Sequence, residues 1–267
     1  KDPRASLKGG LYHAEEAILN LDLVQSLKKP AGFFDPSNPL NERLSNEDKE
    51  DEEEKPLAER SRNSRSPMLS FSNTDMAFSG NVMVAGSYHG FNIYNLDNQG
   101  HAKLVSSVIC PGGQGDVSIV GNLLIMSVEQ NRGRIDCGLQ GAGTEPNPER
   151  FRGIRIFDIS DLKRPQQVGA VQTCRGSHTH SVVSGPDENG IIIVYNSGTS
   201  SVRDQEELES CFEAIPGDNR TALFRIDVIE IPVADPSQAK IVKSPTVFAD
   251  PETGALAGLW RGGDHGD

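Results

Sequence analysis

The chain has 267 residues, a formal net charge of −12 and a hydrophobic content of 36%, with 27 glycines and 16 prolines. This length suits one large β domain, and the many glycines and prolines favour turns and strands over helices. The negative charge argues against a nucleic-acid partner, because binding to phosphates requires clustered lysine and arginine side chains. The sequence also has no apolar run of about 18 residues, so no transmembrane segment is predicted.

Residues 1–40 are interpreted as an N-terminal arm. Ala14, Ile18 and Leu21 have approximately helical spacing before Pro30, so we expect either a short helix or a packed arm. The first ten residues, KDPRASLKGG, lack the apolar core of a signal peptide. If the protein is exported, we therefore expect this sequence to be the mature form.

Residues 41–70 are the most polar part of the sequence. Between Glu47 and Glu59, eight acidic residues accompany two lysines, which gives a local net charge of −6. A segment of this composition buries too little apolar surface to form a core, and we expect an exposed loop. An acidic cluster of this kind is also able to hold a calcium ion or to dock on a basic partner.

Residues 71–267 contain a repeated pattern of short strands. The segment DMAFSGNVMVAG, which begins at Asp75, aligns with DVSIVGNLLIMS, which begins at Asp116, 41 residues later. Each segment is followed by a strand, an Asp-bearing turn, another strand and a closing cysteine; the second copy reads GIRIFDISDLKRPQQVGAVQTC. A looser third copy begins at His180. A period near 40 with four strands per period predicts the blades of a β-propeller.

The predicted fold class is therefore all-β, a β-propeller of four-stranded blades to which this chain supplies about three blades, roughly half, and the N-terminal arm. Three blades leave open sheet faces at both ends, so we expect another chain, or a continuation of this one, to supply the second half of the propeller. Polar insertions interrupt the second and third copies. The blades are expected at 75–110, 116–174 and 180–248, and the start of the next blade at 259–267.

The four cysteines lie beside strand-like segments and lack the spacing of a zinc or redox site. Their even number is compatible with two disulfides, most simply Cys110 with Cys137 and Cys174 with Cys211. Four cysteines allow three pairings, and the alternative is four buried free thiols.

The repeat carries a resemblance to a known family. The pattern GIRIFDISD, followed by a proline and Val-Gly, resembles the LVIVD-repeat β-propellers of bacteria, and so do the segments CRGSHTHSVV and LYHAEEAILNLDLV. The resemblance covers most of the chain from Leu11 onward. It implies a secreted propeller of about six to eight blades and implies nothing specific about activity.

Four residues are candidate metal ligands. In a propeller, the inner strands of successive blades begin near one mouth of the central channel, and the alignment places Asp75, Asp116 and His180 at that position. His178 lies two residues earlier, on the same face of an extended strand. Two carboxylates and two imidazoles would suit a divalent metal, either calcium or a transition metal.

A structural interpretation of these residues is favoured over the metal, because turn-capping aspartates are common in propellers. The aspartates would then accept hydrogen bonds from backbone amides between neighbouring blades. Asp264 and His265 fall near the next ring position and join the cluster only if the register continues. The His-x-His pair also resembles selenium-binding-protein propellers, which are linked to copper-dependent thiol oxidation. Arg152, Arg155 and Arg175 are expected to make surface ion pairs.

No nucleophile elbow, Walker loop or dinucleotide fingerprint is present. The sequence therefore favours a non-catalytic function: an exported binding or assembly module of a cell-surface, periplasmic or extracellular protein complex. The alternative is a metal-dependent enzyme, with redox chemistry as one form, whose site lies at the mouth of the propeller channel. In a third interpretation the metal only ties the blades together.

Overall fold

The computed structural model describes residues 2–10, 13–33, 72–143, 146–213, 220–247, 250 and 252–253. The acidic segment 41–70 and the expected next blade at 259–267, with Asp264 and His265, lie outside the described residues. Within these ranges, no helix is long and apolar enough to cross a membrane.

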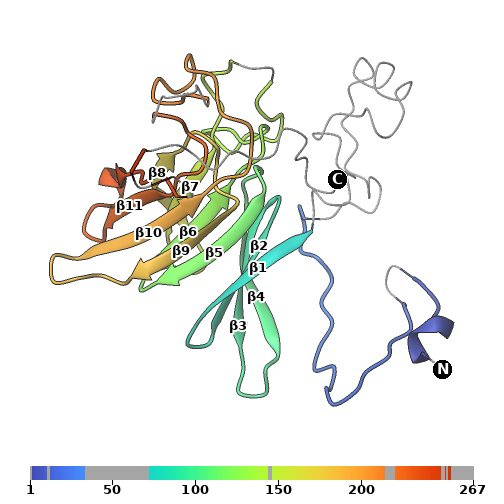
Figure 1. Ribbon diagram of the computed structural model, residues 1–267. Coiled ribbons are helices and arrows are strands. Elements are labelled where there is room, and N and C mark those ends of the chain that lie inside the picture. Colours follow the sequence, from blue (N-terminus) through green and yellow to red (C-terminus); the bar gives the residue numbers. More distant parts are fainter. Residues whose placement is uncertain are drawn as a thin grey trace.

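Three four-stranded antiparallel sheets make up the fold, and each is a simple meander (Figure 1). Blade 1 contains β1 (Asn73–Ser79), β2 (Val82–Ser87), β3 (Gly90–Leu96) and β4 (Ala102–Ile109). Blade 2 contains β5 (Gln114–Val120), β6 (Leu123–Val128), β7 (Gly153–Asp158) and β8 (Gln166–Gln172). Blade 3 contains β9 (Thr179–Ser184), β10 (Ile191–Ser197), β11 (Asp227–Pro232) and β12 (Lys240–Lys243). Among the described residues, helical structure is limited to short 3-10 turns such as η1 (Pro3–Ser6) and η4 (Pro236–Gln238), so the predicted all-β fold of propeller-type blades is confirmed.

The first strand of each sheet is the inner strand of its blade. β1 and β2 lie against β5, and β5 lies against β9, so the sheets face one another in sequence order. One apolar cluster joins blades 1 and 2, and a second joins blades 2 and 3. Because blade 2 has a neighbour on both faces, β6 is buried along its whole length, whereas β1 has no fully buried residue.

Blades 1 and 2 approach closely at two glycines. Gly115 has φ of +67°, and a Cβ added to it would collide with the carbonyl oxygen of Ser87. A Cβ added to Gly86 would in turn collide with the Gly115 carbonyl oxygen. Only residues without a side chain allow the end of β2 and the start of β5 to pass at this distance.

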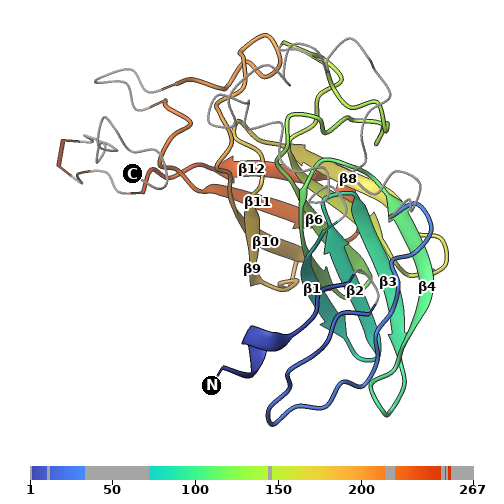
Figure 2. The same ribbon diagram turned by 90° about the vertical axis from the view of Figure 1, so that its right-hand side faces the viewer.

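The N-terminal arm contains no helix over residues 13–33, although a helix was one of two expectations. Ile18 and Leu21 are exposed, so a short helix here would have no apolar surface to pack against and would be marginal in water. The chain instead runs as an extended arm beside blade 1 (Figure 2). Three contacts fix the arm: Lys29 Nζ donates to Asn73 Oδ1 at 3.1 Å, the Ala102 N–H donates to Gln25 Oε1 at 2.7 Å, and buried Phe33 lies edge-on to His89 with ring centroids 5.6 Å apart.

We predict that Gly115→Ala destabilises the protein by about 3 kcal/mol or more, because it combines a left-handed φ with a backbone collision. Gly121→Ala is the matched control: Gly121 has φ of +58°, and its added Cβ would meet nothing within 4 Å. The control therefore loses only about 1 to 2 kcal/mol. Denaturant unfolding of both variants measures the difference, and equal losses would contradict the close approach of blades 1 and 2.

Candidate binding site

Both polar insertions lie at one end of the blades. They connect β6 to β7 and β10 to β11, at residues 129–152 and 198–226, and β5 and β9 begin at that same end. Figures 1 and 2 show the two insertions side by side there, in green and in orange. We call the described residues of these two insertions the cap.

Two disulfides attach the cap to the blades. Cys110, which follows β4, is bonded to Cys137 in the first insertion, and Cys174, which follows β8, is bonded to Cys211 in the second. The predicted pairing is therefore confirmed, and the alternative of four free thiols is wrong. Each bond closes a loop and so restricts the unfolded chain.

A buried ion network joins the two insertions. Arg150 Nε lies 2.8 Å from Glu207 Oε1, and Arg203 Nε lies 2.9 Å from Glu207 Oε2; all three side chains are at most 1% exposed. The N–H of Asn147 also donates to Glu207 Oε1. Burial alone would raise the pKa of Glu207, but the bonds from Arg150, Asn147 and Arg203 outweigh it and lower the pKa below its usual value. The charged form is therefore the one that the fold stabilises.

Further polar contacts hold the second insertion on blade 2. Glu129 Oε1 accepts from the N–H groups of Thr199 and Ser200 at 2.5 and 3.2 Å. Arg152 Nη1 donates to Ser200 Oγ at 2.7 Å and to the Ser201 carbonyl oxygen at 3.1 Å. The expected surface position of Arg152 is wrong, since its side chain is fully buried here.

Arg155 is also fully buried, contrary to expectation. Its guanidinium donates to the Ile135 carbonyl oxygen and to Gln167, and it lies 4.1 Å from the centre of the Phe151 ring. Burial lowers the pKa of Arg155 to about 10. Arg175 is only partly buried and donates to the carbonyl oxygens of Ser200 and Thr199. Polar insertions have no hydrophobic periodicity, so nothing in the sequence indicated that Arg155 and Arg175 bond the carbonyl oxygens of the two insertions.

The outer surface of the cap exposes two large apolar side chains. Ile135 is 51% exposed and Leu139 is 64% exposed, both within five residues of the Cys110–Cys137 disulfide. Burial of exposed apolar side chains such as these by a partner is favourable, because their surface is removed from water. This surface is the candidate binding site.

Three of the four predicted metal ligands come together below the cap. Asp75 Oδ2 accepts from the Val117 N–H at 3.1 Å, and Asp116 Oδ2 accepts from the His180 N–H at 2.9 Å. Each aspartate of one inner strand therefore holds the inner strand of the next blade. Val117 and His180 each donate the backbone N–H to the aspartate of the preceding inner strand, so His180 is equivalent to Val117 and not to Asp116. The third copy is therefore shifted by one residue relative to the sequence alignment.

The His180 side chain is fully buried between blades 2 and 3. Its Nδ1 lies 3.0 Å from Asp116 Oδ2 and 2.8 Å from Ser127 Oγ, which in turn lies 2.7 Å from Ser177 Oγ. Burial raises the pKa of Asp116, but the bonds from His180 outweigh it and leave the pKa below its usual value. The Nε2 atom of His180 is buried and has no hydrogen-bond partner in the structure as described.

His178 does not join this cluster through any described side-chain contact. It is half-buried, and its N–H donates to the Ser197 carbonyl oxygen at 2.9 Å. Over the described ranges, no three side chains of His, Cys, Asp or Glu gather as a metal site would require. The metal site stays a prediction, and the bonds above match the structural interpretation in which aspartates join neighbouring blades.

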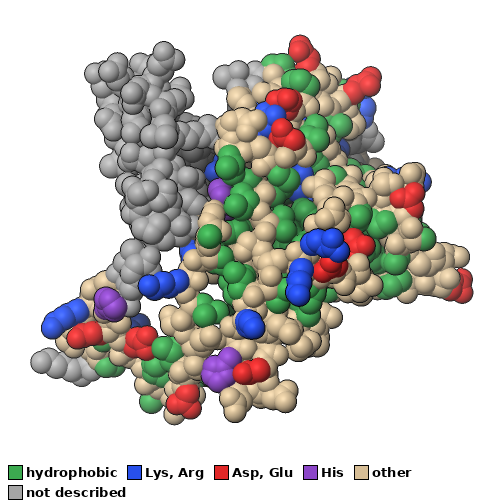
Figure 3. All heavy atoms as spheres, turned by 180° about the vertical axis from the view of Figure 1, so that it is seen from behind, with side chains coloured by type: hydrophobic (Ala, Val, Ile, Leu, Met, Phe, Trp, Pro, Cys, Tyr) green, Lys and Arg blue, Asp and Glu red, His purple; other side chains and the backbone are tan. Residues whose placement is uncertain are grey.

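Charged side chains are mixed on the surface. On the side shown in Figure 3, basic and acidic side chains of the described residues alternate among hydrophobic ones, and no basic patch forms. This face offers no cationic track for a nucleic-acid backbone.

No protein-family model matches the chain, and no curated protein matches its sequence. Among solved structures, it is similar to Sqt1 of Saccharomyces cerevisiae, with a TM-score of 0.29 and 12% identity over 66% of this chain. It is also similar to a protein from Lactobacillus plantarum, with a TM-score of 0.22 and 12% identity over 67% of this chain. The chain spans 51% of the Sqt1 structure and 72% of the second. Likeness this distant carries no argument about function, and the propeller-type fold rests on the three sheets themselves.

We predict that Glu207→Gln lowers the free energy of unfolding by about 3 kcal/mol, because two buried guanidinium groups lose their counter-charge. Exposed Glu209→Gln is the control and changes stability by less than about 0.5 kcal/mol. Because the folded pKa of Glu207 is depressed, its contribution is complete above the unfolded pKa and is lost as the pH falls through the folded pKa. Unfolding curves between neutral and acidic pH should therefore converge for wild type and Glu207→Gln; parallel curves would contradict the network.

Proposed function

We propose that this chain is part of an exported, LVIVD-type β-propeller that acts as a non-catalytic binding or assembly module, with the cap as its contact surface. The cell surface, the periplasm and the extracellular space are the compartments that this role fits. The partners are other proteins of such a complex, together with the remainder of the propeller.

The observation that carries the proposal is the construction of the cap. Two disulfides and the buried Arg150–Glu207–Arg203 network hold the two insertions in one arrangement. A preorganised loop surface loses little conformational entropy on binding, which favours affinity. Ile135 and Leu139 then supply exposed apolar anchors on this rigid support.

Export is supported by the disulfides. Structural disulfides form and persist in oxidising compartments and are rare in a reducing cytosol. Both cysteine pairs of this chain are bonded, and Cys110, Cys174 and Cys211 are buried. The bonds therefore serve as permanent parts of the fold, as in other exported proteins.

The test uses capture on immobilised protein from the extracellular or periplasmic fraction of the source cells. We predict that wild type retains a protein in stoichiometric amounts, and that Ile135→Asp combined with Leu139→Asp reduces this binding at least about tenfold, since charges replace the apolar anchors. Leu19→Asp, at an arm residue that is 83% exposed, is the matched control and should bind normally. Equal capture by all variants, or substrate turnover by the purified protein, would contradict the proposal.

The alternative function is a metal-dependent enzyme at the mouth of the channel. The observation in its favour is the buried Nε2 of His180, which lacks a partner in the described structure and lies on the side chain that contacts Asp116. A calcium or transition-metal ion would require further ligands, and Asp75 lies next to Asp116.

This alternative predicts about one metal ion per chain in elemental analysis by mass spectrometry, lost in both Asp116→Ala and His180→Ala. Asp97→Ala is the control, because Asp97 forms a similar but exposed pair with His101. Without bound metal, Asp116→Ala should only lower stability, by about 1 to 3 kcal/mol, because the His180 N–H loses its partner. That second result would leave the binding module as the better account.

A further inference from the structure

Blade 1 has one face turned away from blade 2. The residue pattern on this free face matches the pattern on the blade 2 face that packs against blade 1. The same cross-strand pairs occur in both sheets: Met76 with Ala85 and Phe78 with Met83 in blade 1, Val117 with Met126 and Ile119 with Leu124 in blade 2. Met83 also pairs with Tyr94 as Leu124 pairs with Phe157. In blade 2 these residues pack against blade 1, whereas Met76 and Phe78 are 58% and 57% exposed.

Blade 3 also has one face turned away from blade 2. The residue pattern on this free face matches the pattern on the blade 2 face that packs against blade 3. Tyr195 pairs with Val228 as Ile125 pairs with Ile156, and Ile193 pairs with Glu230 as Leu123 pairs with Asp158. In blade 2 the residues Ile125, Ile154 and Ile156 are buried against blade 3. On blade 3 the corresponding face is open, with Tyr195 42% and Val183 51% exposed.

The two open faces are therefore complementary to each other. Blade 1 presents the side that receives a preceding blade, and blade 3 presents the side that a following blade covers. Each of these two sheet faces exposes large apolar side chains that another sheet can cover. The apolar free face of blade 3 in one chain can therefore cover the apolar free face of blade 1 in another chain.

We propose that two copies of this chain associate head to tail, with blade 3 of each copy packed on blade 1 of the other, and so close a ring of six blades. This inference rests on the assembly role proposed above. Two identical heterologous contacts close when one copy is rotated by a half-turn, and six blades lie within the usual range of propellers. Both open faces would be buried in the same complex.

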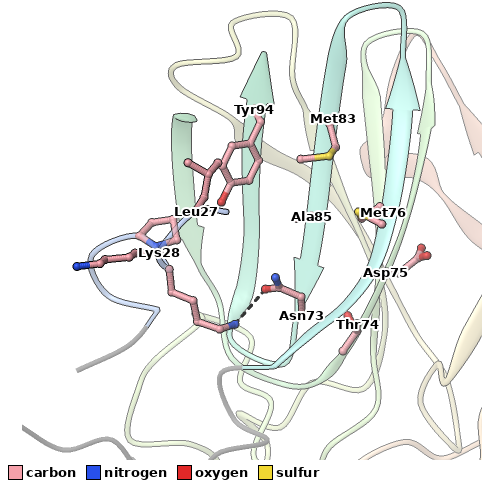
Figure 4. A pocket seen from close by; sticks show the side chains of 11 residues that line it. Leu27, Lys28, Asn73, Thr74, Asp75, Met76, Met83, Ala85 and Tyr94 are labelled. Carbon is pink, nitrogen blue, oxygen red and sulfur yellow. Dashed lines mark hydrogen bonds between the residues drawn. The ribbon is translucent and has the colours of Figure 1, made fainter. Parts of the chain in front are cut away.

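The N-terminal arm shapes the docking surface on blade 1. A pocket of about 370 Å³ lies between the arm and the sheet. In Figure 4, Leu27 lies beside Tyr94 on one side of this pocket, and Met76 and Met83 lie on the other. The Lys29–Asn73 hydrogen bond lies at its edge, and Asp75 points away from it. The arm thus covers part of the face and leaves an apolar cavity that apolar side chains of an incoming blade can enter.

This contact would be weaker than those within the chain. Asp75 and Asp116 each hold the next inner strand through a backbone N–H, but Thr179 occupies the equivalent position in blade 3 and supplies no carboxylate. The junction between copies would rely on apolar packing alone. We therefore expect association that depends on concentration.

The test is molar mass by sedimentation and by light scattering of the purified 28.9 kDa chain over a range of concentrations. We expect a species of twice that mass for wild type, and monomers for both Phe78→Asp and Tyr195→Asp. Mixing these two variants should restore a dimer, because one of its two junctions then contains only wild-type faces. Leu139→Asp on the cap is the matched control and should remain dimeric, and thermal unfolding checks that each variant is folded.

A wild-type chain that stays monomeric at the highest concentrations would overturn the inference, and so would dimers unaffected by Tyr195→Asp. A dimer lost in both variants but not restored by mixing them would also overturn it, because the head-to-tail arrangement leaves one junction of wild-type faces in the mixed dimer. The proposed function fails separately: its partner binding depends on Ile135 and Leu139, whereas association of copies depends on Phe78 and Tyr195.

Discussion

Apolar packing of one sheet against the next is the constraint on which the rest of this structure depends. A four-stranded sheet with aliphatic side chains on both faces has to cover both, and each buried isoleucine or leucine contributes about 1.5 to 3 kcal/mol. Blade 2 meets this condition through its contacts with blades 1 and 3. The end blades meet it on one face only, which explains why exposed large apolar side chains such as Phe78 and Tyr195 occur there.

The polar chemistry is concentrated at one end of the blades and serves mainly to hold parts together. Asp75 and Asp116 join adjacent inner strands, His180 lies between Asp116 and Ser127, and Glu207 joins the two insertions of the cap. A buried charge is tolerated only when it is paired and hydrogen-bonded, and Glu207 satisfies both conditions. The result is a fixed loop surface above a rigid set of sheets, which suits recognition of a partner.

The fold could be predicted because its signal is repeated. The Asp75 and Asp116 segments carry the same strand, Gly-Asn turn and strand, and each copy strengthens the interpretation of the other. For the cysteines, the sequence left three pairings and free thiols open, and the structure contains the simplest pairing. For the arm, the sequence left a short helix and a packed arm open, and the structure has an extended arm beside blade 1. Prediction failed where the pattern is short, because the third copy is offset by one residue from the alignment. His178 and His180 share a predicted face but have different surroundings.

The sequence by itself determined the class of fold and the four-stranded repeat, because strand periodicity and turn residues act over a few positions in the chain. Only the tertiary structure decided that Arg150, Arg152 and Arg155 are buried, that Asp116 holds His180, and that the two insertions form one cap. These features depend on which residues distant in sequence meet in space. Burial of a polar side chain is favourable only after its partner has been placed, so a local pattern contains no signal for it.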